Sequence, residues 1–428
     1  AARAGGGPVL YAERTQPGHG TDRHLRLGGL QPATPIRLVG GTAVLAPELV
    51  AALEARYDEA AAGGPPPQMR AMWVHLFDAT LKSREGIDRA LDAAAAANLN
   101  TVIVEVARRQ DAYYTSSVLP RTPDPDMPAD LDLLARLVPA ARDRGLAVHA
   151  WVPALPAWHE RYAGQRLPLW EAHGAGSAEP WVSVDASGRQ GTFFDPGVPA
   201  VADHVVAVFR ELAERYAIDA VHVDYLRYES AEWGYHPISL QRFRQATGAT
   251  GTPPPNDPAW SDWRREQTRQ LATRIRNAVR QVSPHVAVSM AGSTIGEPPA
   301  STSDYRNTRT WGDVFQAWPD WLREGLVDAV FPMNYFDASA RATWFDGWVA
   351  FERHLRAQCG CRLAVGVGAW LNTPDGSLQQ VRSALDAGDG AVVYSYQQNA
   401  RRGYPPQALL GALRDGPYAA PAPPPALR

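Results

Sequence analysis

The chain contains 428 residues, of which 20% are charged, and its formal net charge is −3. A chain of this length can bury one large core and carry additional segments. The charge balance lacks the basic surface that nucleic-acid binding requires, so we expect no nucleic-acid partner. No run of about 18 apolar residues occurs, so we expect no membrane span. The first residues also show no leader peptide.

Lysine and cysteine are rare in this chain, and their scarcity argues against several catalytic mechanisms and metal sites. Lys82 is the only lysine, which argues against a mechanism built on a lysine nucleophile or base. Cys359 and Cys361 are separated by a single glycine and no cluster of histidines flanks them, so we expect no metal site there. A local disulfide between them is an alternative, but we expect two unbonded thiols.

Composition divides the chain into three parts. In residues 1–66, short apolar runs alternate with glycine and proline, and a helix is predicted over residues 47–61. We interpret this part as an N-terminal extension. Residues 67–416 are predicted to form the main domain. Residues 417–428 are rich in proline, which predicts a disordered tail or the start of a linker.

The main domain alternates short apolar runs with helical stretches. Strands are predicted at residues 71–75, 101–106, 147–151, 220–225, 286–290, 329–335, 363–367 and 391–396. Helices are predicted at residues 84–97, 131–144, 198–216, 260–282, 319–324, 343–358, 377–387 and 406–413. Eight such units indicate the α/β class and a (β/α)8 TIM barrel, with long loops after strands three and four. A doubly wound sheet would also alternate, but eight clean units favour the closed barrel.

The fourth predicted strand ends in a cluster of polar and aromatic residues. Its apolar residues lead directly into Asp224, followed by Tyr225 and Arg227. Active sites of such barrels are built where strands end and loops begin, so Asp224 is the first candidate for a catalytic carboxylate. Arg227 could tune a nearby carboxylate or simply close the loop with a salt bridge. Asp219, early on the strand, is predicted to be a turn residue.

Other strand exits supply a second acid and several aromatic residues. Glu105 ends the second strand and is the predicted partner of Asp224. Indole rings can cover the apolar face of a sugar while carboxylates and amides bind its hydroxyls. The predicted substrate-binding residues are therefore Trp73, Trp151, Trp370, His149, Asn334, Tyr335, Asp337, Tyr225 and Arg227. The alternative for the three tryptophans is that they only fill the upper layer of the barrel.

Motifs of other enzyme classes are not found. No glycine-rich phosphate loop follows a strand in the required context, and no Gly-x-Ser-x-Gly turn occurs. His75, His149 and His222 could bind a metal only if the fold brought them together, and single histidines inside barrels are more often hydrogen-bonded core residues. We therefore predict neither a metal nor another cofactor.

Several sequence blocks between Met69 and Gln398 resemble the glycoside-hydrolase-like barrel family GHL-ten. They are Met69-Arg-Ala-Met-Trp-Val, Asn100-Thr-Val-Ile-Val-Glu-Val, Asp111-Ala-Tyr-Tyr-Thr-Ser, Val148-His-Ala-Trp-Val-Pro, Phe194-Asp-Pro-Gly-Val-Pro, Asp219 to Tyr228, Gly325-Leu-Val-Asp and Pro332-Met-Asn-Tyr. The resemblance implies a glycosidase acting on a bacterial or extracellular polysaccharide, such as N-acetylhexosamine-containing peptidoglycan strands. It also implies secretion or residence in the periplasm.

The chain departs from this family at two places. Family members often have Gln-Val-Arg-Pro where this chain has Glu105-Val-Ala-Arg, and a double aspartate where it has Val223-Asp224. These departures leave the substrate open. A weaker likeness to family-eighteen chitinases rests on Asp219-x-x-x-x-Asp224 and Met333-Asn-Tyr-Phe-Asp337. In that register the acid would fall at Leu226, which has no proton to donate, so the acid is either Asp224 or Glu105.

The leading hypothesis is a glycoside hydrolase in which Asp224 and Glu105 are the catalytic carboxylates. A separation of about 5–5.5 Å between them would indicate a retaining enzyme, and about 6.5–9.5 Å an inverting one. The first alternative is a carbohydrate-binding barrel without turnover, and the second is a metal-dependent polysaccharide deacetylase or hydrolase. The sequence leaves open the sugar, its linkage, endo or exo cleavage and the oligomeric state.

Overall fold

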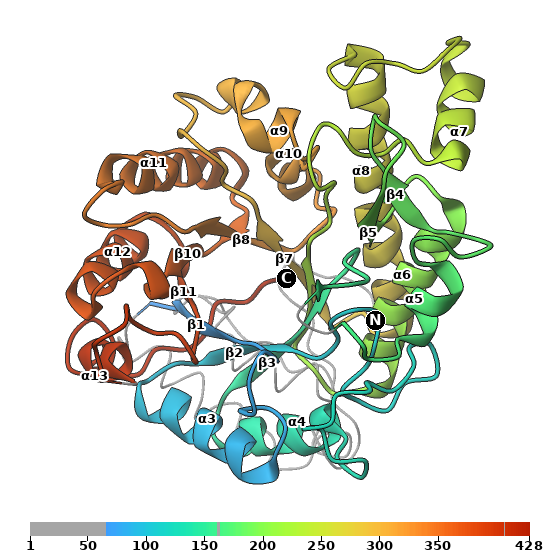
Figure 1. Cartoon of the computed structure of the whole chain (residues 1–428). Helices are drawn as coiled ribbons and strands as arrows, with labels where there is room; N and C mark the ends of the chain where they lie inside the picture. Colours follow the sequence, from blue (N-terminus) through green and yellow to red (C-terminus); the bar gives the residue numbers. More distant parts are fainter. Residues whose placement is uncertain (1–65, 161–162, 406) are drawn as a thin grey trace, which may run out of the picture.

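A computed structural model describes residues 66–160, 163–405 and 407–428 of the chain (Figure 1). The N-terminal extension, with its predicted helix at 47–61, lies outside these residues. Eight parallel strands form the barrel: β1 (Met69–Val74), β2 (Thr101–Glu105), β3 (Ala147–Pro153), β6 (Ala220–Asp224), β7 (Ala287–Gly292), β8 (Ala329–Asn334), β10 (Val365–Gly368) and β11 (Gly390–Tyr394). Strand β11 pairs with β1, and β10 pairs with β8, which closes the ring. The prediction of a TIM barrel is therefore confirmed.

Helices surround the strand ring (Figure 1). The main ones are α3 (Arg84–Ala96), α4 (Leu133–Asp143), α6 (Pro199–Arg215), α8 (Pro258–Val282), α10 (Trp318–Arg323), α11 (Ala342–Cys359), α12 (Pro374–Ala387) and α13 (Ala408–Arg414). Side-chain oxygens cap several of their first turns: Ser83 accepts a hydrogen bond from the Gly86 N–H, and Asp132 accepts one from Ala135. Because these helices cover the outer face, the strands are buried on both faces and read as nearly continuous apolar runs.

Alternate residues of each strand point into the barrel, and the size of these side chains changes along the strands. Near the strand starts the interior contains small residues, including Ala71, Ala220 and Ala287. Further along, Trp73 and Phe331 fill the interior. The period of two in a strand puts Asp224 on the same side as Ala220, so its carboxyl follows the inward row.

Composition predicted that the proline-rich tail is disordered or begins a linker, but in the structure the tail packs across the base of the barrel. Arg70 donates a hydrogen bond from Nη1 to the Ala420 carbonyl at 2.6 Å, and the Asn100 amide donates to the Ala422 carbonyl at 2.9 Å. Leu427 is 8% exposed and joins the side chains of the barrel interior. The tail therefore fills the space that the small residues at the strand starts leave open.

The long loop after β3 contains structure that the sequence did not predict. Helix α5 (Pro168–His173) and a hairpin of β4 (Val182–Val184) and β5 (Gln190–Phe194) precede α6, and α7 (Pro237–Thr247) follows β6. Buried Asp195 ties these parts together, because it accepts hydrogen bonds from the hydroxyls of Ser183 and Ser239. The hairpin thus lies beside the loop that follows Asp224.

Two further expectations concern the cysteines and the membrane. The structure joins Cys359 and Cys361 in a disulfide, so the expectation of two unbonded thiols is wrong. They lie at the end of α11, where Gly360 turns the chain with a φ of +63°.

Among the described residues, none of the helices has the length and apolar character needed to cross a membrane.

Candidate active site

Asp224 is a buried carboxyl at the C-terminal end of β6. It is 5% exposed, and its two oxygens accept hydrogen bonds from the Trp151 indole N–H at 3.0 Å and the Tyr225 backbone N–H at 2.6 Å. Burial raises its pKa to about 6, although these donors and the charge of Arg227 oppose the rise. In mildly acidic solution Asp224 can therefore be protonated, and its carboxylic acid can still give this proton to a substrate.

The residues after Asp224 turn sharply, which places their side chains around it. Tyr225 has a φ of +52°, in the left-handed region, and this turn directs its N–H at the Asp224 carboxyl. The guanidinium carbon of Arg227 lies 4.8 Å from the centroid of the Tyr225 ring. Leu226 is buried in the apolar core, so the chitinase acid position is occupied by a packing residue.

Glu105, at the end of β2, is also buried and is held in place by two neighbours. Its carboxylate accepts the Leu76 N–H at 2.7 Å and the Arg108 Nε–H at 3.0 Å, and it forms an ion pair with the same guanidinium. Its negative charge contributes to the raised pKa of Asp224. The structure therefore brings the two predicted carboxylates to one end of the barrel. Glu105 forms an ion pair with Arg108, whereas Asp224 forms none with the cationic side chains that the structure describes.

Aromatic rings line the space beside these carboxyls. The ring centroid of Tyr394, at the end of β11, lies 5.5 Å from that of Tyr335 and 6.3 Å from that of Trp151. Trp73 lies deeper in the barrel and is 2% exposed, with its ring centroid 6.3 Å from that of Tyr335. Trp73 thus forms part of the floor of the site. Trp370 lies at the rim and is 41% exposed.

His149 lies inside the barrel and not at its mouth. His149 Nδ1 is 3.1 Å from the Ser289 hydroxyl, which is also 3.0 Å from His222 Nδ1. His222 accepts a hydrogen bond from the Trp73 indole at 3.3 Å, and both imidazoles stack on Phe331. Burial holds the pKa of His222 well below its usual value. Within the part of the chain that the structure describes, no three His, Cys, Asp or Glu side chains are grouped so as to hold a metal ion.

Asn334 and Tyr335, two predicted sugar-binding residues at the end of the sixth barrel strand, point in opposite directions. The Asn334 amide donates to Glu352 of α11 at 3.2 Å, so this side chain faces the helix layer and does not reach the site. The reason is strand alternation: Ala329 and Phe331 point inward, so Asn334 points outward and Tyr335 inward. Asp337 lies on the following loop, where it accepts hydrogen bonds from Ser339 and forms an ion pair with Arg401.

Three residues of the site had no role assigned from the sequence: His75, Arg108 and Tyr394. His75 Nδ1 accepts the Phe77 N–H at 3.2 Å, and burial lowers the pKa of His75 while the charge of Glu105 raises it. Arg108 pairs with Glu105 across three residues, a spacing visible in the sequence. Each follows or ends a barrel strand, so position alone is the signal that could have identified them.

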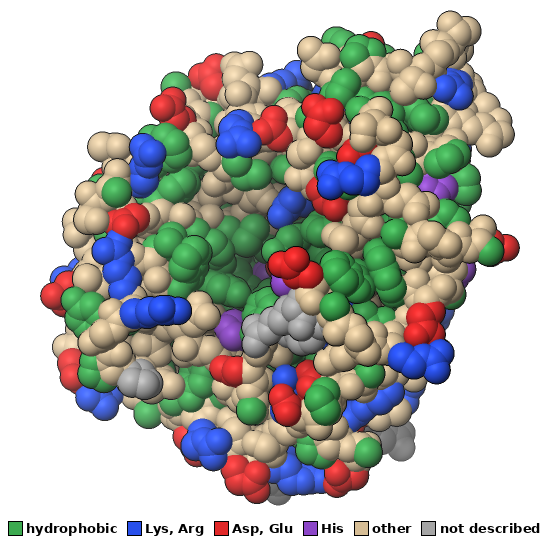
Figure 2. Space-filling view, in the orientation of Figure 1, with side chains coloured by type: hydrophobic (Ala, Val, Ile, Leu, Met, Phe, Trp, Pro, Cys, Tyr) green, Lys and Arg blue, Asp and Glu red, His purple; other side chains and the backbone are tan. Residues whose placement is uncertain are grey.

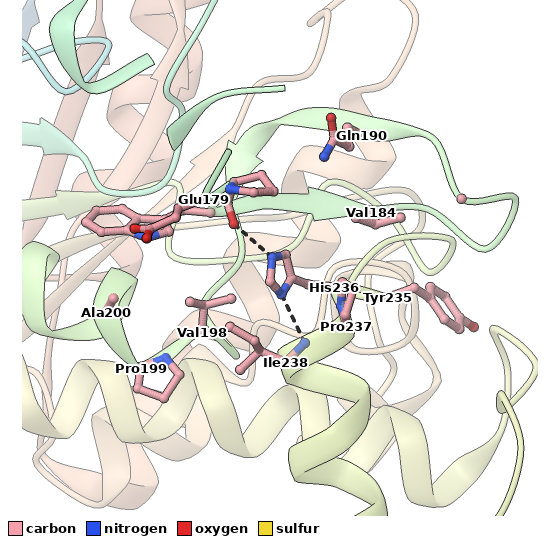
Figure 3. Close-up of a pocket in the computed structure, with 13 residues that line it drawn as sticks. Glu179, Val184, Gln190, Val198, Pro199, Ala200, Tyr235, His236, Pro237 and Ile238 are labelled. Atoms are coloured by element: carbon pink, nitrogen blue, oxygen red, sulfur yellow. Dashed lines mark hydrogen bonds between the residues drawn. The ribbon is translucent and has the colours of Figure 1, made fainter. Parts of the chain in front are cut away.

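Figure 2 shows the face of the molecule that is turned to the viewer in Figure 1, with a hollow near its centre. Hydrophobic side chains gather around the hollow, together with acidic, basic and histidine side chains. A separate pocket of about 1100 Å³ lies between the β4–β5 hairpin and the first turns of α6 and α7 (Figure 3). Its lining includes Trp181 and Ile238, and His236 is bonded there to the Pro180 carbonyl at 2.9 Å. None of the predicted site residues lines this second pocket.

Known proteins resemble the chain in sequence over much of the barrel. A glycosyl hydrolase YngK from Bacillus subtilis is 24% identical over 302 residues, which cover 65% of this chain and 56% of that protein. A glycosyl hydrolase DigH from Escherichia coli K12 is 25% identical over 301 residues, covering 68% of this chain and 66% of that protein. The chain thus spans less than two thirds of the length of either relative.

Solved structures share the fold at low sequence identity. The PgaB (BpsB) glycoside hydrolase domain from Bordetella bronchiseptica superposes with a TM-score of 0.57 at 16% identity, covering 83% of this chain and 97% of that domain. An endo-β-1,4-mannanase from Thermotoga petrophila gives a TM-score of 0.52 at 11% identity, covering 83% of this chain and 77% of that one. Residues 68–355, more than half of the chain, match the family described as glycosyl hydrolase-like 10. The chain belongs to this family.

Proposed function

We propose that the protein is a glycoside hydrolase that cleaves a bacterial or extracellular polysaccharide, with Asp224 as the general acid. The observation that carries the proposal is the buried Asp224 carboxyl at the end of β6, whose pKa is raised to about 6 and whose two oxygens are fixed by N–H donors. A glycosidase needs a carboxylic acid that keeps its proton until the leaving oxygen takes it. Family membership and the barrel fold support the same class of reaction.

In the proposed reaction the Asp224 carboxyl gives its proton to the glycosidic oxygen as the bond from this oxygen to the anomeric carbon breaks. Water adds to the anomeric carbon, and its proton passes to the Glu105 carboxylate before returning to Asp224 through solvent. Arg108 and the Leu76 N–H hold the Glu105 carboxylate in one orientation. The negative charge of Glu105 also favours the positive charge that develops on the sugar ring.

The sugar would lie against the rings of Tyr335, Tyr394 and Trp151, above the floor formed by Trp73. Apolar ring faces pack on pyranose C–H groups, and this requires few polar contacts. N-acetylhexosamine polymers such as peptidoglycan glycan strands are the substrates we propose first, because the resemblance of the sequence blocks to the glycosyl hydrolase-like 10 family implies them. We also propose that the protein works outside the cytoplasm, where a disulfide such as Cys359–Cys361 persists.

A glycan panel tests the proposal. Peptidoglycan with and without stem peptides, chitin, galactosaminogalactan and plant β-glucans would be incubated with the unsubstituted protein and with Asp224→Asn. We expect release of shorter fragments from at least one polymer and its loss in Asp224→Asn. Asp203→Asn, an exposed aspartate on α6, is the matched control and should keep full activity. Equal cleavage by Asp224→Asn would remove Asp224 from the mechanism.

A carbohydrate-binding barrel without turnover is the second candidate. One observation favours it: both Glu105 oxygens already accept hydrogen bonds, from Arg108 and the Leu76 N–H. A carboxylate held in this way could serve only to shape the groove. Binding of a polymer from the same panel, with no fragments released after prolonged incubation at pH 5 to 6, would support this candidate over the hydrolase.

A further inference from the structure

Few large apolar side chains are exposed in the part of the chain that the structure describes, and most of them follow neighbouring barrel strands. Among the described residues, the exposed members are Phe77, Ile238, Trp370 and Tyr404, with 37%, 41%, 41% and 46% of their surface accessible. Three of the four are aromatic and follow β1, β10 and β11, which are consecutive strands of the barrel. Apolar surface that gathers beside a site marks an interaction surface more often than chance exposure does.

The three loops that carry these rings are joined by hydrogen bonds. Gln397, after β11, donates to the His75 carbonyl at 2.8 Å and accepts the His75 N–H at 3.3 Å. Arg401, on the same loop, donates its backbone N–H to the Asn372 carbonyl at 2.9 Å, and its Nε–H donates to the Leu371 carbonyl. The loops that carry the three rings are therefore tied to one another.

Phe77 connects this group to the catalytic carboxylates. The guanidinium carbon of Arg108 lies 3.4 Å from the centroid of the Phe77 ring, and the same guanidinium binds Glu105. The preceding residue, Leu76, donates its N–H to Glu105. The exposed aromatic surface thus begins beside the carboxylates and extends outward over the ends of β11 and β10.

Barrel topology places this surface across the mouth from Asp224. In the ring β1, β2, β3, β6, β7, β8, β10, β11, the strand opposite β6 is β11. On the β6 side the β4–β5 hairpin forms a wall, since the Phe193 and Tyr225 ring centroids are 5.7 Å apart. A polymer held at Asp224 would therefore leave the site over the β11 side, where the exposed rings lie.

We propose that Phe77, Trp370 and Tyr404 form an aromatic rim that binds successive sugar units of the polysaccharide, outside the unit held at Asp224. The proposal rests on the proposed function, because it extends the same groove. Aromatic faces bind the C–H faces of sugars with little dependence on the hydroxyl pattern, so the rim selects for a long chain and not for one sugar. The substrate class is then a polymer of several units, not a disaccharide.

Binding measurements separate the rim from catalysis. Phe77→Ala, Trp370→Ala, Tyr404→Ala and their triple combination would be made in the Asp224→Asn protein, which we expect to bind the polymer without cleaving it. Affinity electrophoresis with denuded peptidoglycan strands, chitin oligosaccharides and β-glucan gives the dissociation constant for each. We expect each single substitution to weaken binding of the polymer roughly 3- to 10-fold and the triple substitution to weaken it more than any single one.

Matched controls make the result specific. Ile238→Ala removes the remaining exposed apolar side chain, on α7, and should leave polymer binding unchanged. Thermal unfolding of each variant checks that the fold persists, and Tyr404→Phe should retain the affinity that Tyr404→Ala loses. A short oligosaccharide that fills only the site beside Asp224 should bind the Trp370→Ala and Tyr404→Ala variants as tightly as the Asp224→Asn protein itself, whereas Phe77 packs on Arg108 and its variant is not used for this comparison.

The outcomes distinguish the rim from the proposed function. Weaker polymer binding in the rim variants, with the Ile238→Ala protein unaffected, supports the rim even if no cleavage is found. Unchanged polymer binding in the triple variant overturns the rim while leaving the hydrolase proposal standing. If none of the three polymers binds the Asp224→Asn protein, the rim proposal falls as well.

Discussion

The two ends of the barrel are built from the same strands, but the base is packed with apolar side chains and the mouth carries buried carboxyls. At the base, small side chains and the docked tail make an apolar plug in which Leu427 is nearly buried. At the mouth, the strands end in Asp224 and Glu105, carboxyls buried among aromatic rings. We therefore expect residues at the base to contribute to the free energy of unfolding and residues at the mouth to contribute to chemical reactivity, as in other barrels of this kind.

The buried carboxyl of Asp224 at the mouth lowers the free energy of unfolding of the folded protein. Burying a carboxyl without a cation in direct contact disfavours its charged form, which is why the pKa of Asp224 rises to about 6. Above that pH the folded protein must hold a charge that the unfolded chain solvates more easily. Substitutions at the two ends should therefore have opposite effects on activity and stability.

The largest expected effect is at the mouth. Asp224→Asn should lower kcat by about 10²- to 10⁴-fold, because the leaving oxygen loses its proton donor. The same substitution should raise the free energy of unfolding at pH 7 by on the order of 1–3 kcal/mol, since the buried charge is removed. Chemical denaturation at pH 7 and at pH 4 measures this gain, which should vanish at pH 4, where Asp224 is protonated in the folded state. A destabilised Asp224→Asn protein would contradict the account of the mouth.

At the base the effects should be reversed. Leu427→Ala removes a side chain that fills the barrel interior and should lower the free energy of unfolding by about 2–4 kcal/mol. Activity per folded molecule should not change, because the tail lies at the opposite end from the carboxyls. Denaturation in urea and kcat measured on the cleaved polymer provide the two readings. An unchanged stability would show that the tail does not pack as described.

At Glu352, in the helix layer between the two ends, we expect an effect on stability alone and none on activity. Glu352 is 1% exposed, and burial raises its pKa well above the usual value, although the Asn334 amide opposes the rise. Below the pKa of the unfolded chain both states are protonated, so nothing is lost. As pH rises from there toward the folded pKa, the protein loses stability.

Glu352→Gln should therefore stabilise the protein at neutral pH and have little effect near pH 4. Melting temperatures of both proteins across this range test the prediction. A difference of the same size at pH 4 and pH 7 would point to packing and not to titration.

Most of the barrel could be predicted from the sequence, because strands buried on both faces give apolar runs that need no partner to be recognised. The hairpin Val182–Val184 and Gln190–Phe194 was missed because its strands are short and rich in polar residues. The docking of the tail depends on Arg70 and Asn100, which are about 320 to 350 residues away, so local composition could not reveal it. Proline content alone predicted disorder there.

The site was predictable in its position and less so in its details. Asp224 and Glu105 end strands and point inward, as a period of two requires. The same count along β8 would have shown that Asn334 faces the helices, with Phe331 and Tyr335 on the other side. The Trp151 donor of Asp224 comes from a different strand and needed the fold, whereas the Arg108 partner of Glu105 is only three residues away in the sequence.

The pH dependence of cleavage tests the central claim most directly. If Asp224 is the general acid, kcat/KM should fall on the alkaline side with a midpoint near pH 6, where this carboxyl loses its proton. Because the charge of Arg227 holds this pKa down, Arg227→Met should move the midpoint to higher pH. A profile that is flat from pH 5 to pH 8, or a midpoint that does not move in Arg227→Met, would contradict the assignment of Asp224 as the acid.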